Sequence, residues 1–322
     1  MLSKKRVIII AIIVFIFLII GWWFWNQNQP FVERLFSNRM NSQNSTPSPT
    51  PLDNNIKNKV IIITDCALDA FWHDPDDALA LLYLFTNQNV DVEAVITTFG
   101  NTSEPQVFNS VQLLLQETGF TTTVIRGAKN KTDINIEVKN FLENLNASDY
   151  TLLSIGPLTN LQVLDKEKLQ SFKKIYVMGG ALKHGNVIPL FKKEWNFAKD
   201  PDSAKYVLET SNVELITLDT TTRISLQPAV LRTIFARYPI LGKRIRAWDT
   251  LNKFLYWHVA YPHDLIAAMA ITNSGFFNVS TENLKVLNGQ LKKDDTGTSQ
   301  NVYDITDITS FYAAISDWAQ KL

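Results

Sequence analysis

Four acidic residues lie close together near the start of the regular part of the chain. Asp65 follows an apolar run, and Asp74, Asp76 and Asp77 follow it in the segment 74–81. Helix capping explains one or two acids at a helix start. Four converging carboxylates repel one another, by about 4 kcal/mol per pair at 4 Å and an effective dielectric near 20, so they imply a cation, a shared proton or a splayed geometry. An all-oxygen site would favour calcium or magnesium.

Polar residues also follow several later apolar runs. They occur at 97–101, 156–160 and 178–180, and the last group is followed by Asn186 and 194–196. A further polar group, 262–264, opens an apolar stretch that is predicted to be a helix. Each group alone is typical of a turn or a helix cap, and His263 alone is typical of a structural histidine. Their repeated occurrence after apolar runs indicates one shared site.

The elements that must position these residues alternate along the chain. Short β-branched runs predict strands at 60–64, 92–98, 122–125, 150–154, 174–177 and 213–218, and helical periodicity appears at 77–85, 105–117, 137–145 and 200–209. Such alternation predicts an α/β fold, an open, mostly parallel sheet with helices on both faces. Ligands of such sheets bind beyond the carboxyl ends of the strands, where the polar groups lie.

The N-terminal region has a different composition. Residues 1–6 are basic, residues 7–25 are apolar and end in aromatic residues, and residues 26–58 form a polar, breaker-rich stretch. This pattern predicts a cytoplasmic N-terminus, a transmembrane signal-anchor helix in the lipid bilayer at 7–25, a disordered linker at 26–58 and an extracytoplasmic catalytic domain at 59–322. A cleaved signal peptide is the alternative interpretation of the apolar run.

Composition excludes some functions. Lys plus Arg and Asp plus Glu both number 31, so no net charge attracts nucleic acid. The single cysteine, Cys66, excludes an internal disulfide and any multi-cysteine metal site. The sequence leaves open whether the protein forms a homo-oligomer.

The motifs, taken in order, resemble those of the inosine-uridine preferring nucleoside hydrolases. The resemblance runs from about Lys59 to Leu322 and rests on Asp65 with the segment 74–81, followed by 100–101, 156–160, 177–180, 185–186, 194–196, 200–201 and 263–264. Each short motif is weak, but the ordered set is specific. It implies a nucleoside hydrolase-like fold and calcium-dependent hydrolysis of the N-glycosidic bond of ribonucleosides to free base and ribose, as in purine and pyrimidine salvage.

The resemblance also implies a role for each matched residue. Asp65, Asp77 and Asp264 would ligate calcium, together with the backbone carbonyl of Thr159. Asp65 would also act as general base on a water molecule, and His263 would protonate the leaving base. The residues implied to contact the ribose are Asp76, Asn101, Met178, Asn186, Glu194 and Asn196.

Three departures from the family pattern leave alternatives open. Ile63 stands where an earlier acid is expected and the loop 66–73 is longer, so Asp69 is an alternative to Asp65 as the first metal ligand. Trp195 replaces an expected phenylalanine. The helical region between about Leu226 and Tyr261, where the family usually contacts the base, is short. The aromatic residues Trp72, Tyr256 and Trp257 would either stack on a base there or belong to the core. The alternative functions are a catalytically weakened, calcium-dependent ribosyl-binding protein and a hydrolase of another N-ribosyl compound.

Overall fold

The computed structural model describes residues 57–68, 73–187, 193–255 and 260–322. These residues all belong to one compact unit, Asn55–Leu322. Within the described ranges, none of the helices combines the length and the apolar character that a membrane crossing requires. The predicted membrane segment 7–25 and residues 26–56 of the predicted linker 26–58 lie outside the described residues, and the last residue of that linker, Asn58, begins the first strand.

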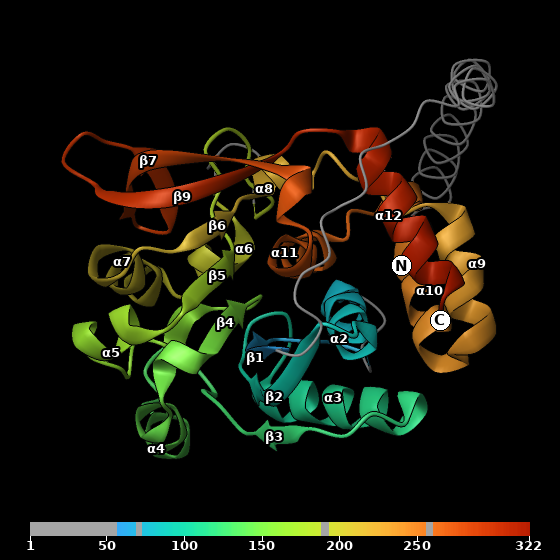
Figure 1. Ribbon diagram of the computed structural model, residues 1–322, viewed down its shortest axis with the longest axis horizontal. Helices are drawn as coiled ribbons and strands as arrows, with labels where there is room; N and C mark the ends of the chain where they lie inside the picture. The colour runs from blue at the N-terminus through green and yellow to red at the C-terminus, as the bar shows by residue number, and fades with distance from the viewer. Residues whose placement is uncertain (1–56, 69–72, 188–192, 256–259) are drawn as a thin grey trace, which may run out of the picture. The chain divides into compact units, whose positions relative to one another are not determined.

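The described residues form a nine-stranded sheet, in the order β3-β2-β1-β4-β5-β6-β9-β7-β8 (Figure 1). The first six strands are parallel, and β9 continues the parallel arrangement beside β6. The strands are β1 (Asn58–Thr64), β2 (Val90–Thr97), β3 (Thr123–Ile125), β4 (Tyr150–Ser154), β5 (Lys174–Met178), β6 (Glu214–Ile216), β7 (Phe277–Leu287), β8 (Gln290–Lys293) and β9 (Thr298–Ile305).

Helices cover both faces of this sheet. The α-helices are α2 (Asp76–Thr86), α3 (Glu104–Thr118), α4 (Ile136–Asn144), α5 (Lys166–Ser171), α6 (Trp195–Lys199), α7 (Pro201–Thr210), α8 (Leu218–Thr221), α9 (Pro228–Arg237), α10 (Pro239–Leu255), α11 (His263–Thr272) and α12 (Ile308–Gln320). Short 3-10 turns are η1 (Ala147–Asp149), η2 (Leu158–Asn160) and η4 (Ser274–Phe276). Apolar residues of α2, α3, α9, α10, α11 and α12 share one core, whereas those of α4, α5 and α7 share the other.

Strand β1 is apolar at each of the four consecutive positions Val60–Ile63, and its place in the sheet explains why. Val60 and Ile62 belong to one core, while Ile61 and Ile63 belong to the other, and all four side chains are fully buried. Successive side chains of a strand point to opposite faces, so a strand covered on both sides needs apolar residues at every position. The prediction of an open, mostly parallel sheet with helices on both faces is confirmed.

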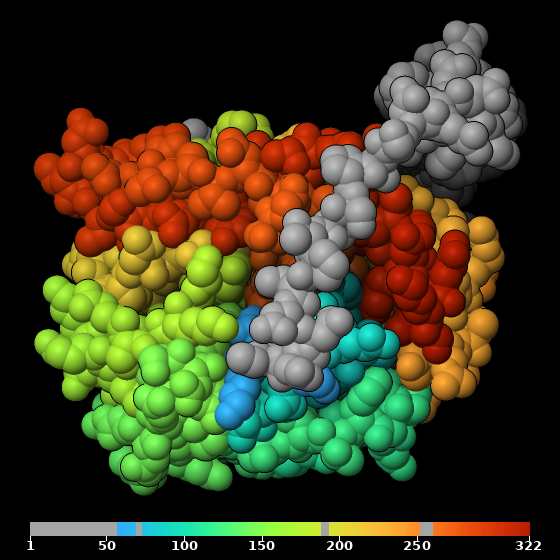
Figure 2. Space-filling view, viewed as in Figure 1, coloured from blue at the N-terminus to red at the C-terminus, as the bar shows by residue number. Residues whose placement is uncertain are grey.

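The C-terminal strands were not predicted. β7 pairs antiparallel with both β8 and β9, and Figure 2 shows this orange segment packed along the green and yellow segments that precede it. Asn288 and Gly289 connect β7 to β8 with positive φ angles of 51° and 76°. Two consecutive residues with positive φ are typical of the tight hairpin turn whose twist matches that of the strands.

Candidate active site

A cavity of about 430 Å³ lies beyond the carboxyl ends of β1, β2, β4 and β5. Every residue assigned to the site from the sequence lines it, except Thr159. The lining residues are Asp65, His73, Asp74, Asp76, Asp77, Asn101, Ile155, Met178, Asn186, Glu194, Trp195, Asn196, Trp248, Leu251, His263 and Asp264.

Two helix starts and one strand end bring the carboxylates together. Asp76 and Asp77 are the first two residues of α2, Asp264 is the second residue of α11, and these two helices pack against each other. Oxygens of Asp76, Asp77 and Asp264 lie within 4.8 Å of one another, and all three residues are buried. Asp65 directly follows β1, and its main-chain N–H donates to Oδ1 of Asp77 (3.2 Å).

Hydrogen bonds fix the direction of each carboxylate. The hydroxyl of Thr64 donates to Oδ1 of Asp77, and the N–H of Asp264 donates to Oδ2 of Asp76 (3.1 Å). The N–H of Asn101 donates to Oδ2 of Asp65 (2.6 Å). These contacts hold several acidic groups in place, despite the repulsion between them.

Burial and mutual repulsion raise the pKa values of three carboxyl groups at this site, those of Asp65, Asp77 and Asp264. Desolvation, reinforced by the charges of Asp76 and Glu194, raises the pKa of Asp65 from 3.8 to about 8, although the Asn101 N–H opposes the shift. Desolvation and the neighbouring carboxylates also raise the pKa values of Asp77 and Asp264 well above the ordinary value. No lysine or arginine occurs among the described residues that line the cavity. The cluster therefore needs either bound protons or a cation.

A tight loop between β2 and α3 carries Asn101 to this cluster. A Cβ at Gly100 would lie 2.1 Å from Oδ2 of Asp65, so only glycine permits the close approach. The side-chain nitrogen of Asn101 donates to the carbonyl of Asp74 (2.5 Å), and its Oδ1 lies 3.2 Å from Nδ1 of His73. The loop is thus tied both to the strand end at Asp65 and to the start of α2.

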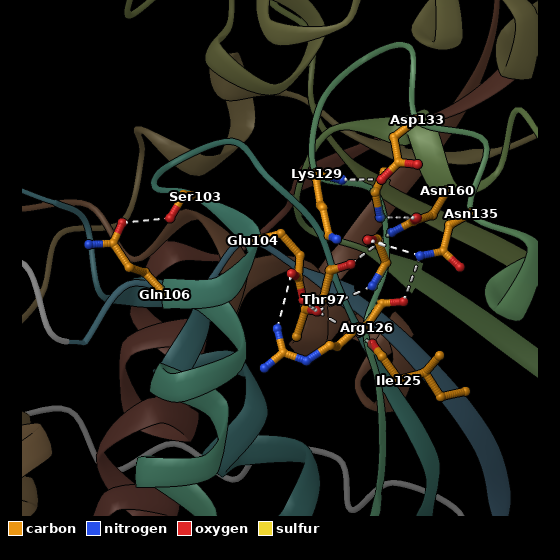
Figure 3. A network of polar contacts seen from close by, with 12 residues as sticks. Thr97, Ser103, Glu104, Gln106, Ile125, Arg126, Lys129, Asp133, Asn135 and Asn160 are labelled. Carbon is orange, nitrogen blue, oxygen red and sulfur yellow. Dashed lines mark hydrogen bonds and ion pairs between the residues drawn. The ribbon is translucent and has the colours of Figure 1, made fainter.

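A second network holds the two ends of the same loop (Figure 3). Glu104, the fully buried first residue of α3, accepts a hydrogen bond from the hydroxyl of Thr97 (2.7 Å) at the end of β2. Its other oxygen pairs with the guanidinium of Arg126 (3.3 Å). The side chain of Asn160 donates to the carbonyl of Thr97 (3.0 Å) and accepts from the N–H of Ala128 (2.9 Å). These contacts join the loops that follow β2, β3 and β4.

Four of the residues predicted to contact ribose form a further wall of the cavity: Met178, Asn186, Glu194 and Asn196. Glu194 caps α6 by accepting from the N–H groups of Asn196 (2.7 Å) and Phe197 (3.1 Å), and it also accepts from the N–H of Gly180 (3.0 Å). Asn196 donates to the carbonyl of Met178 (3.2 Å). Burial raises the pKa of Glu194, opposed by those three N–H groups. Asn186 is the exposed member of this wall.

His263 opens α11 beside the acidic cluster. Its Nδ1 lies 2.7 Å from the hydroxyl of Thr221, and its ring centroid lies 5.9 Å from that of Tyr261. The Thr221 contact limits the rotation of the imidazole ring. His263 and His73 provide the imidazole rings among the described lining residues, and His263 directly precedes Asp264 of the acidic cluster.

Thr159 requires a correction. Its hydroxyl donates to Asp200 (2.5 Å), its carbonyl accepts from the N–H of Gln162 (3.3 Å), and it lines a separate cavity with Lys131 and Asp133. The prediction that its carbonyl belongs to the metal site is therefore wrong in this structure. The residue of this motif region that does line the acidic cavity is Ile155, directly after β4, whose carbonyl accepts from the side chain of Asn196 (3.4 Å).

Four other lining residues were missed, and Asp69 is not described. His73 and Ile155 border motifs that were recognised, whereas Trp248 and Leu251 come from α10. The spacing of the apolar residues of α10 indicates an inward face but not a cavity wall. Asp69, together with Trp72, Tyr256 and Trp257, lies outside the described residues.

Known proteins of similar sequence include nucleoside hydrolases. A family model described as inosine-uridine preferring nucleoside hydrolase matches residues 60–312. Uridine nucleosidase 1 of Arabidopsis thaliana is 25% identical over 264 residues, which cover 68% of this chain and 75% of that protein. The inosine-uridine preferring nucleoside hydrolase of Leishmania major is 27% identical over 212 residues, which cover 54% of this chain and 65% of that protein.

Solved structures agree with the fold. A purine-preferring ribonucleoside hydrolase from Gardnerella vaginalis superposes with a TM-score of 0.71 at 18% identity, covering 82% of this chain and 100% of that one. The inosine-uridine preferring nucleoside hydrolase from Bacillus anthracis gives a TM-score of 0.62 at 20% identity over the same shares. Because the family model covers most of the chain, the protein belongs to the inosine-uridine preferring nucleoside hydrolase family, whose members cleave the N-glycosidic bond of ribonucleosides.

Proposed function

We propose that this protein is a calcium-dependent ribonucleoside hydrolase that releases free base and ribose. The observation that carries the proposal is the buried carboxylate cluster of Asp65, Asp76, Asp77 and Asp264 in one cavity. Burial raises the pKa values of Asp65, Asp77 and Asp264, and no lysine or arginine occurs among the described lining residues. Membership of a nucleoside hydrolase family supplies the reaction class.

The donor set fits a hard divalent cation. Asp65, Asp77 and Asp264 offer carboxylate oxygens, and Ile155 offers a backbone carbonyl in place of the one expected from Thr159. A bound calcium ion would supply the positive charge that keeps these carboxylates ionised together and favours deprotonation of water. Asp76 lies within the same cluster, so its side chain belongs at the boundary between the metal and the sugar.

The protein groups suit the charge that develops during hydrolysis. Cleavage of the glycosidic bond builds positive charge on the ribose, and a wall of carboxylate and amide groups stabilises that charge more than it stabilises the neutral substrate. Asp65 is held by the N–H of Asn101 at the edge of the cluster, where it can accept a proton from the attacking water.

His263 is suited to the leaving-group side. The Thr221 hydroxyl contacts Nδ1 of the ring, so we assign proton donation to Nε2. A departing base that accepts this proton does not leave as an anion, which lowers the barrier. Ribose hydroxyls would contact Asp76, Asn101 and Asn186, as well as the Glu194 and Asn196 wall.

The test is release of ribose from inosine, uridine and cytidine, with calcium and with a chelator. We expect turnover of at least one nucleoside, lost on chelation and restored by added calcium. Absence of calcium-dependent turnover on every nucleoside would contradict the proposal. Nucleoside affinity without turnover would instead indicate a ribosyl-binding protein, and turnover confined to other N-ribosyl compounds would indicate a different substrate class.

We also propose that residues 7–25 anchor the protein in a membrane, with the N-terminus in the cytoplasm and the catalytic domain outside. The proposal rests on the basic residues 1–6, the apolar run and the aromatic residues at its end. Protease added to intact cells should degrade the catalytic domain. Protection of that domain in intact cells, with degradation after lysis, would overturn the predicted orientation.

A further inference from the structure

A second histidine, His73, lines the cavity from the loop that precedes α2. It directly precedes Asp74, the residue whose carbonyl accepts the Asn101 side chain. It lies on a different element from His263, the histidine assigned to the leaving base. The proposed reaction gives His73 no role, although its position in the cavity and its contact with Asn101 call for one.

The hydrogen bonds of Asn101 determine which ring nitrogen of His73 must carry a hydrogen. A carbonyl oxygen can only accept, so the contact with Asp74 (2.5 Å) must be made by the Asn101 nitrogen Nδ2. The Asn101 oxygen then faces Nδ1 of His73 at 3.2 Å. An amide oxygen can only accept, so Nδ1 must carry the hydrogen. The neutral tautomer with its hydrogen on Nδ1 can make this contact, and so can the doubly protonated ring.

Asn101 is therefore held at three points. Its main-chain N–H donates to Asp65 (2.6 Å), its Nδ2 donates to Asp74, and its Oδ1 faces the His73 donor. Asn101 is half-buried and lies in the cavity wall, so the direction of its amide determines which polar atoms are presented to a bound sugar.

We propose that His73 is a positioning residue that fixes the amide of Asn101 for ribose recognition through its Nδ1 hydrogen. The inference rests on the proposed hydrolase function. It concerns the long first loop of this chain, because both His73 and the Asp74 carbonyl belong to the segment that connects β1 to α2. A fixed amide lowers the cost of ordering the site around the transition state, so its loss should reduce kcat more than it raises KM.

Three substitutions separate this role from others. His73→Phe keeps a ring and removes the donor, His73→Asn places a donor near the position of Nδ1, and His73→Gln places one near the position of Nε2. With inosine or uridine as substrate, we expect His73→Phe to lower kcat about tenfold, the effect of one lost hydrogen bond. His73→Asn should restore most of that loss, and calcium affinity should stay unchanged in all three variants.

Each outcome has one meaning. Rescue by His73→Gln but not His73→Asn would overturn the inference, since it would indicate direct contact of Nε2 with the substrate. Equal turnover of His73→Phe and the unsubstituted protein would also overturn it. If the unsubstituted protein has no turnover, the proposed function fails separately. The side-chain amide NMR signal of Asn101 then tests the contact itself: it should shift in His73→Phe and return in His73→Asn, and an unchanged signal would refute the contact.

Discussion

At the scale of single residues, hydrogen bonds from the backbone and from Thr64 fix the positions of the acidic side chains. Asp77 receives hydrogen bonds from the Thr64 hydroxyl and the Asp65 N–H, while Asp76 receives one from the Asp264 N–H. Each of these donors comes from a strand end or a helix start. The positions of the oxygens are therefore set by the fold, and the remaining repulsion among them favours cation binding.

Asp77→Asn should abolish high-affinity calcium binding and lower turnover by at least about a hundredfold, since it removes one charged ligand from the centre of the cluster. Calorimetric titration with calcium and ribose release measure the two effects. Asp317→Asn, at an exposed position of α12, is the matched control and should change neither quantity. Full activity of Asp77→Asn would exclude Asp77 from the metal site.

Calcium affinity should rise with pH. In the metal-free protein, burial and repulsion raise the pKa of Asp65 to about 8 and the pKa values of Asp77 and Asp264 in the same direction. Calcium must displace the bound protons, so its affinity should increase as the pH approaches 8. Titrations in buffers of different ionisation enthalpy measure the protons released. A pH-independent affinity with no proton release would contradict this expectation.

The same raised pKa values determine how the stability of the metal-free protein changes with pH. A carboxyl group whose pKa is raised in the folded state stabilises that state fully below the unfolded value of 3.8, and the contribution disappears as the pH rises through about 8. The metal-free protein should therefore lose melting temperature over this range, and saturating calcium should reverse the loss. Thermal melts with chelator and with calcium at several pH values check the sign.

At the scale of elements, the buried side chain of Glu104 holds the two ends of the loop from β2 to α3 together. Glu104→Ala should lower the free energy of unfolding by about 3 kcal/mol, because it leaves the Thr97 hydroxyl and the Arg126 guanidinium without their shared acceptor. Urea denaturation measures the change. Glu143→Ala, which removes an exposed pair with Lys139 on α4, is the matched control and should cost less than about 0.5 kcal/mol.

The parallel strands were predictable, whereas the C-terminal strands were not. A strand covered on both faces is an unbroken apolar run, and Val60–Ile63 shows this pattern clearly. By contrast, most side chains of β7 are exposed, including polar residues such as Ser280 and Thr281, so its sequence lacks the apolar signal of a strand. β7 is defined by pairing with β9, a long-range interaction that no local pattern reveals.

The acidic residues that share the cavity could be predicted, because side-chain chemistry carries that signal. Carboxylates such as Asp264 are rare at buried positions and are conspicuous beside an apolar run. A backbone carbonyl ligand has no residue type of its own, so the sequence does not distinguish Thr159 from Ile155 in that role. Trp248 reaches the cavity from α10, and an apolar residue looks the same in a sequence whether it faces a cavity or the core.

At the scale of the whole molecule, anchoring and catalysis should be separable. Every described residue of the cavity belongs to the compact unit Asn55–Leu322, which follows the predicted anchor at 7–25 in the sequence. Deletion of residues 1–54 should move the protein from the membrane fraction to the soluble fraction, while kcat and KM for its nucleoside stay within about twofold, because no ligand or cavity wall is removed. Cell fractionation and kinetics of both forms measure this. Retention of the shortened protein on membranes would show that residues 7–25 are not the anchor. Loss of activity in a folded, soluble form would show that residues 1–54 contribute to the site.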